Sequence, residues 1–147
     1  MLSMKLPGLL VYYGQIQMSN SMSLFRVYTS LCVYHKDMSV NQMIEVLEYE
    51  PSRSNETSDK HKASACIYTT KDEIESVDLD RHLEYLISHL KDIFKRVGTG
   101  NKHGFHSTVS VFWEAPSVSC GGPTLGSKYM KFFGDLGIDF WFDFWIE

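Results

Sequence analysis

The carboxyl-terminal end of the chain alternates strictly between two kinds of side chain. Every second position is apolar: Ile138, Phe140, Phe142, Phe144 and Ile146. The positions between them hold two tryptophans among three carboxylates: Asp139, Trp141, Asp143, Trp145 and Glu147. A period of two predicts a β-strand, with one face in the core. The other face is too acidic for an interior and too aromatic for simple solvent contact, so we expect it to be a contact surface.

Length and composition predict a single folded domain. The chain has 147 residues, of which 44% are hydrophobic and 14% aromatic, which is enough for one packed core. Its net charge of -4 and its scattered basic residues argue against nucleic acid or an anionic membrane as the main partner. Cys32, Cys66 and Cys120 lack any C-x-x-C spacing, so we expect reduced thiols in a cytoplasmic protein.

The amino-terminal segment does not fit a targeting signal. Its apolar run, Leu6 to Tyr13, is far shorter than the roughly 20 residues of a spanning helix, and no cleavage pattern follows it. Residues 1–22 are therefore expected to be an extension, either flexible or adding a short edge strand through Leu9 to Tyr13. The domain itself is expected to comprise residues 23–147.

Apolar periodicity divides the rest of the chain into strands and helices. The expected strands are residues 23–33, 65–70, 108–114 and 138–147, and the expected helices are residues 39–49, 78–97 and 125–136. Ser39 and Gln42 have the spacing of a capping box, and Gly98 is suited to end the second helix. Residues 52–64 contain no large apolar side chain and are expected to form a solvated loop.

This order of elements predicts an α+β fold. The strands alternate rather than running continuously apolar, so one sheet face is expected to lack helices, unlike the doubly wound alternative. We expect a two-layer sandwich with a mixed sheet of four strands, or five if the extension adds one. About three helices should lie mainly on one face.

Several of these segments together resemble a known family. They read LFRVYTS, MSVNQMIEVLEYEPSRS, DLDRHLEYLISHL, STVSVFWEA and GGPTLGSKYMKFFGDLGIDFWFDFWIE. In this combination the chain is similar, over residues 23–147, to the bacterial family catalogued as domain of unknown function 4279. It departs at Ala65, Cys66 and Ile67, where similar proteins often have a tryptophan. The resemblance implies a small cytosolic bacterial protein and brings no activity or catalytic residues with it.

Two glycine-rich stretches do not fit nucleotide-binding loops. Residues 98–104 follow a helix and lead into a strand, which reverses the order of a dinucleotide-binding turn. Residues 121–128 have the Gly-x4-Gly spacing of a phosphate loop, but Ser127 and Lys128 stand in the wrong order to bind magnesium and phosphate. A structural turn is therefore favoured over weak anion binding, and we expect no cofactor.

No metal site or catalytic group is predicted either. His82 and His89 lie seven residues apart on one helix, a separation of roughly 10 Å, which is too far for shared coordination. Asp139 and Asp143 are roughly 13 Å apart along a strand, which excludes an acid pair within it. Glu114 could approach one of them if their strands are neighbours.

The sequence therefore favours a non-enzymatic protein-binding module. Its expected binding residues are Trp141, Trp145, Asp139, Asp143, Glu114, Tyr28 and Arg26. By analogy, an inhibitor or immunity-type protein would present such a face. The alternatives are a small-molecule-binding protein, or an enzyme, that uses the tryptophans as a ligand platform, and a homodimer whose interface covers them.

Overall fold

The computed structural model describes residues 25–116 and 122–146, which form one sheet and four helices. The strands are β1 (Arg26–His35), β2 (Arg53–Asn55), β3 (Ser64–Thr69), β4 (His106–Ala115) and β5 (Asp139–Ile146). The helices are α2 (Val40–Leu47), α3 (Leu79–His89), α4 (Lys91–Val97) and α5 (Ser127–Asp135). The sheet order is β2-β3-β1-β4-β5, and only the pairing of β4 with β5 is parallel. This mixed sheet confirms the predicted α+β class.

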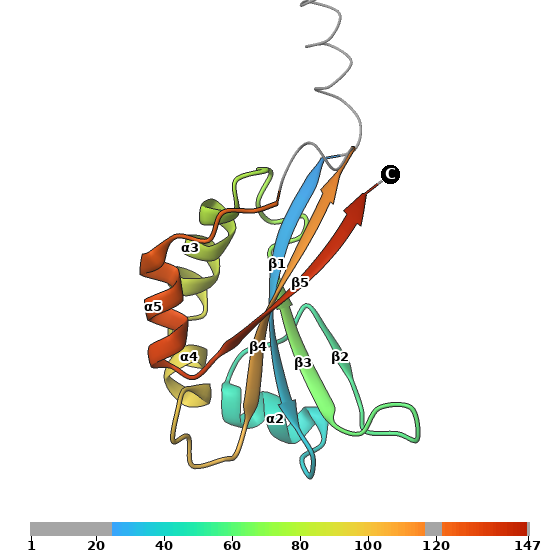
Figure 1. Ribbon diagram of the computed structural model, residues 1–147. Helices are drawn as coiled ribbons and strands as arrows, with labels where there is room; N and C mark the ends of the chain where they lie inside the picture. Colours follow the sequence, from blue (N-terminus) through green and yellow to red (C-terminus); the bar gives the residue numbers. More distant parts are fainter. Residues whose placement is uncertain (1–24, 117–121, 147) are drawn as a thin grey trace, which may run out of the picture.

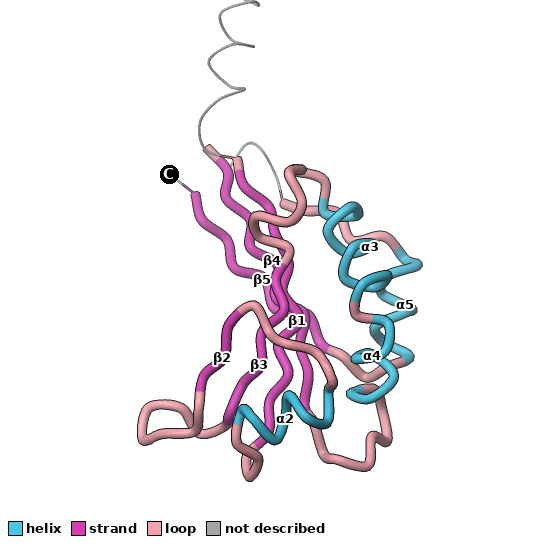
Figure 2. Tube along the Cα trace, turned by 180° about the vertical axis from the view of Figure 1, so that it is seen from behind, coloured by secondary structure: helices cyan, strands magenta, loops and turns pink. Residues whose placement is uncertain are grey.

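The helices lie on one side of a strongly twisted sheet (Figures 1 and 2). Alternation along β4 builds the core, because Val109 and Val111 are buried beneath the helices while the residues between them are only partly covered. Phe133 on α5 is fully buried among the rings of Phe94, Phe132 and Phe140, at centroid distances of 5.6, 5.0 and 5.1 Å. This aromatic cluster joins α4 and α5 to β5.

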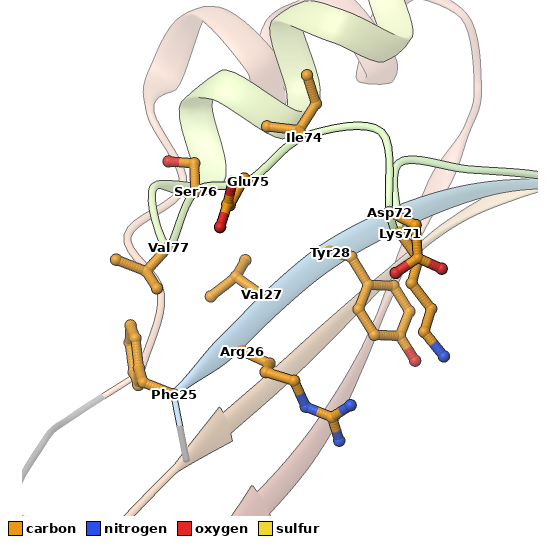
Figure 3. A pocket seen from close by; sticks show the side chains of 10 residues that line it. All are labelled: Phe25, Arg26, Val27, Tyr28, Lys71, Asp72, Ile74, Glu75, Ser76 and Val77. Carbon is orange, nitrogen blue, oxygen red and sulfur yellow. The ribbon is translucent and has the colours of Figure 1, made fainter. Parts of the chain in front are cut away.

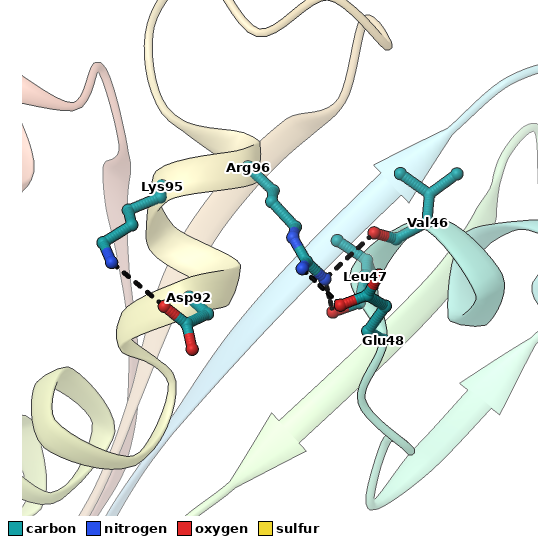
Figure 4. Close-up of polar contacts among 6 residues, drawn as sticks. All are labelled: Val46, Leu47, Glu48, Asp92, Lys95 and Arg96. Atoms are coloured by element: carbon teal, nitrogen blue, oxygen red, sulfur yellow. Dashed lines mark hydrogen bonds and ion pairs between the residues drawn. The ribbon is translucent and has the colours of Figure 1, made fainter.

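Local hydrogen bonds fix the ends of α2. The predicted capping box is confirmed: the Ser39 hydroxyl accepts from the Gln42 amide, and the Gln42 side chain accepts from the Ser39 amide. At the other end, Arg96 on α4 donates to the carbonyl oxygens of Val46 and Leu47, at 3.2 and 2.6 Å (Figure 4). Arg96 therefore satisfies carbonyls that the helix leaves unpaired and ties α2 to α4.

Two predicted elements differ from the structure. The expected helix over residues 78–97 is broken at Leu90, which both ends α3 and precedes α4. The expected loop over residues 52–64 contains β2, whose three residues are all exposed and pair with β3. The sheet thus reaches five strands through β2, and the extension, residues 1–22, lies outside the described residues.

The apolar face of β5 is not the uniform core that its sequence predicts. Ile138 is buried, and Phe140 and Phe142 are partly buried, but Phe144 and Ile146 are 52% and 51% exposed. Figure 1 shows the reason, because β5 diverges from the helix layer as it runs toward the carboxyl terminus. The prediction of a continuous buried face is therefore wrong for the last part of the strand.

Candidate binding face of the sheet

The face of the sheet that lacks helices gathers the predicted binding residues in rows across β1, β4 and β5. Antiparallel register places Arg26 opposite Glu114, and parallel register places Glu114 beside Trp145. Residues opposite each other in a sheet share a face, and successive residues alternate, so the next row on this face contains Tyr28 and Asp143. Pairing thus brings together side chains more than 110 positions apart.

Phe112 on β4 joins the second row. It lies opposite Tyr28 on one side and Asp143 on the other. The Tyr28 and Phe112 rings are stacked, with centroids 4.6 Å apart, and Arg26 lies over the Phe112 ring at 5.7 Å. Lys71 lies 5.7 Å from the centre of the Tyr28 ring. The face therefore has an ordered aromatic centre that the sequence analysis missed, although alternation over residues 108–114 puts Phe112 on the side of Glu114.

The two tryptophans stand at the outer edge of this face. Trp141 is 67% exposed and Trp145 60% exposed. Trp141 lies beside Ser110, and Asp139 lies one row further along the strand. Asp139 and Asp143 are exposed, and neither forms an ion pair with any residue the structure describes. The strand thus presents two large aromatic rings that alternate with two carboxylates.

Charges on the inner part of the face are paired with each other. The Arg26 Nε donates to the Glu114 Oε2 at 2.6 Å, and this hydrogen bond raises the pKa of Arg26. Glu114 lies beside Trp145 rather than beside an aspartate, and its carboxylate is engaged by Arg26. Burial raises the pKa of Tyr28, while the nearby Arg26 lowers it. The arginine and the glutamate thus pair with each other, whereas the two aspartates of β5 form no ion pair with a described residue.

A hollow of about 760 Å³ adjoins the face at the start of β1. Its walls are the start of β1, from Phe25 to Tyr28, and the connection over residues 71–77 (Figure 3). Figure 3 shows Arg26, Tyr28 and Lys71 extending to the same side of β1. The hollow is thus continuous with the row that contains Tyr28 and Phe112, and its rim carries both signs of charge.

A comparison with known protein families identifies the family of this chain. The pattern of the family described as a domain of unknown function, DUF4279, matches residues 25–147. The chain belongs to this family. No curated protein and no solved structure matches the chain. The match covers every strand and helix described above, so the open face is part of the DUF4279 domain.

Within the described part of this DUF4279 chain, no three His, Cys, Asp or Glu residues gather as they would around a metal ion. His82 is fully buried, and both of its ring nitrogens are engaged. Its Nε2 donates to the Ser76 carbonyl oxygen at 2.8 Å, and its Nδ1 is hydrogen-bonded to the Thr70 hydroxyl at 2.6 Å. This histidine therefore holds the start of α3 against the end of β3.

The described helices also include none with the length and apolar character needed to cross a membrane. The two described cysteines, Cys32 and Cys66, are both buried thiols. The register places Cys66 opposite Val33, so the two cysteines point to opposite faces of the sheet. Cys120, and the glycine that begins the stretch over residues 121–128, lie outside the described residues.

Proposed function

We propose that this DUF4279 domain is a non-enzymatic protein-binding module whose open sheet face binds a basic surface of another protein. One observation carries the proposal: Trp141 and Trp145 are 67% and 60% exposed, on a sheet face without helices, where they alternate with Asp139 and Asp143. A tryptophan left in water forgoes a large hydrophobic gain that a partner would supply. Tryptophans are also enriched among the residues that dominate binding energy at interfaces.

Charge supports a basic partner. Arg26 and Glu114 satisfy each other, whereas Asp139 and Asp143 form no ion pair with any described residue. Lys or Arg side chains on the partner would pair with these two carboxylates and accelerate association. An inhibitor or immunity-type protein works in this way, by covering a basic site on its target.

The titratable groups of the face support binding rather than catalysis. The pKa of Tyr28 is raised by burial, so its hydroxyl stays protonated at neutral pH. Glu114 is held by Arg26, and the two aspartates are exposed. A general acid or base needs a pKa near the working pH, and burial moves the pKa of Tyr28 away from it. The buried thiols of Cys32 and Cys66 support a cytoplasmic location.

A small-molecule ligand is the second candidate, because the hollow beside Tyr28 has the volume of an ordinary ligand site. Arg26 and Lys71 on its rim would favour an anionic group. The stacked Tyr28 and Phe112 rings beside it would favour a planar one.

The test begins with affinity capture on the immobilised full chain. The Trp141→Ala/Trp145→Ala double variant is compared with a Tyr49→Ala/Met130→Ala control, which removes two large side chains that are 47% and 52% exposed. A protein retained by the wild type and the control is identified, produced separately and measured by calorimetry. We expect the double tryptophan variant to weaken its affinity about a hundredfold or more, and added salt to weaken it further.

Equal affinity for the double variant and the wild type would refute the proposed role of the face. If no protein binds and the Tyr28→Ala variant instead loses a small anionic ligand, the second candidate takes its place.

A further inference from the structure

Strand β5 forms one edge of the sheet. It pairs with β4 over its whole length, from Asp139 to Ile146, and no other described strand pairs with it. Figure 1 shows β5 as the outermost strand next to β4. Alternate amide and carbonyl groups along this edge therefore point away from the sheet. An edge strand of eight residues with such groups is a template for another strand.

Exposed apolar side chains concentrate on this strand and occupy both of its faces. Of the seven large hydrophobic residues that are exposed in the described structure, four lie on β5. Trp141 and Trp145 lie on the open face, and Phe144 and Ile146 on the face toward the helices. A partner lying flat on the sheet would cover only the first pair. A strand added to the edge would contact both pairs, so edge pairing accounts for the whole pattern.

We propose that β5 pairs antiparallel with β5 of a second copy, about a two-fold axis beside Phe142. The charges of β5 disfavour the two registers nearest to this one. Centred on Phe142, each Trp141 faces the partner's Asp143, and each Asp139 faces the partner's Trp145. Centring on Trp141 would place Asp139 against the partner's Asp143, and centring on Asp143 would place that carboxylate against itself. Like charges directly opposite each other destabilise a strand pair.

The same register is also favourable on the other face. It places Phe140 opposite the partner's Phe144, and Phe142 opposite the partner's Phe142, so aromatic rings meet aromatic rings. It also overlaps the two copies of β5 along nearly their full length. A two-fold pair of this kind closes after two copies and removes one exposed edge from each. The inference concerns the edge of β5, whereas the basic partner proposed above lies on the open face, and both proposals use Trp141 and Trp145.

The register makes opposite predictions for two substitutions at one position. Trp141→Glu would place a carboxylate opposite the partner's Asp143, whereas Trp141→Lys would place an ammonium group there. Both variants remove the same ring from an exposed position, so loss of apolar contact is equal in the two. Met130→Glu and Met130→Lys, at a residue 52% exposed on α5, are controls with the same changes of net charge away from the edge.

Sedimentation equilibrium of the full chain, from about 1 µM to about 500 µM, measures the association. We expect the wild type to shift from monomer to dimer with concentration. Trp141→Glu should weaken the dimer about tenfold relative to Trp141→Lys, because the contact occurs twice across the axis. Phe144→Lys should also weaken it, and the two Met130 variants should differ by less than about twofold.

Three outcomes would overturn the proposal. The first is a wild type that stays monomeric at the highest concentration. This outcome overturns the proposal for the full chain even if deletion of residues 1–24 then produces a dimer. The second is equal weakening by Trp141→Glu and Trp141→Lys, which would show that charge does not set the register. The third is growth beyond two copies, which a closed two-fold pair forbids.

Discussion

Substitution of Phe133 by alanine tests whether one aromatic cluster holds the helix layer to the sheet. Phe133 is fully buried, and its ring contacts Phe94 on α4, Phe132 on α5 and Phe140 on β5, all with edge-to-face geometry. Removing the ring leaves a space whose walls belong to three separate elements. Each wall is held by its own backbone, so collapse of the space is restricted.

The expected loss of stability is about 4 kcal/mol, within the range of about 3 to 5 kcal/mol for a buried Phe→Ala change. The free energy of unfolding of an ordinary domain is about 5 to 15 kcal/mol, so the variant should still fold but with much lower stability. Met130→Ala on the same helix is the control. Met130 is 52% exposed, and alanine favours helix at least as well, so its effect should stay within about 0.5 kcal/mol.

Urea unfolding followed by far-ultraviolet circular dichroism measures both variants. With a slope of about 2 kcal/mol per M, the midpoint of Phe133→Ala should fall by about 2 M at an unchanged slope. A loss below about 2 kcal/mol would show that the cluster adapts to the missing ring. An equal loss of stability in Met130→Ala and Phe133→Ala would contradict the difference in burial between the two residues.

Four further variants test other parts of the molecule. In dilute protein, Phe142→Ala should lower the free energy of unfolding by roughly 1 to 3 kcal/mol because its ring is partly buried, and Trp141→Ala/Trp145→Ala should lower it by less than about 1 kcal/mol. Thermal melts that rank the two variants the other way would place the tryptophans in a core. Deletion of residues 1–21 should leave a cooperative thermal transition, and its loss would make the extension part of the fold. His82→Leu should cost roughly 2 to 4 kcal/mol because a buried hydroxyl and a carbonyl lose their partner; a urea midpoint equal to that of the wild type would mean that water replaces the ring.

Sequence periodicity predicted most of the fold because burial imposes it directly. Strands β4 and β5 alternate along their sequences, and α2 has both its apolar stripe and its capping box. Strand β2 could not be predicted in this way. Its three residues are all exposed, so no apolar period marks them, and only the available edge of β3 gives them a partner. The break at Leu90 is likewise invisible, because one apolar stripe continues through α3 and α4.

Alternation predicted which side chains of one strand share a face, but not their neighbours on other strands. A period of two puts Arg26 and Tyr28 on one face of β1, whereas only the register of β1 against β4 puts Glu114 on the same face. The ion pair of Arg26 with Glu114, and the stack of Tyr28 on Phe112, depend on the register of β1 against β4. Register is set by the core residues on the opposite face, so it emerges only when the whole sheet is assembled.

The exposure of the carboxyl-terminal end of β5 follows from the different lengths of α5 and β5. Helix α5 connects β4 to β5 and packs beside β5 through Phe133 and Phe140. Its nine residues span about 13 Å, whereas the eight residues of β5 extend over about 26 Å. A helix half as long as its strand cannot cover the apolar face from end to end. Phe144 and Ile146 therefore lie beyond the helix and need some other contact, and pairing of the β5 edge would supply one on the same strand that carries the tryptophans.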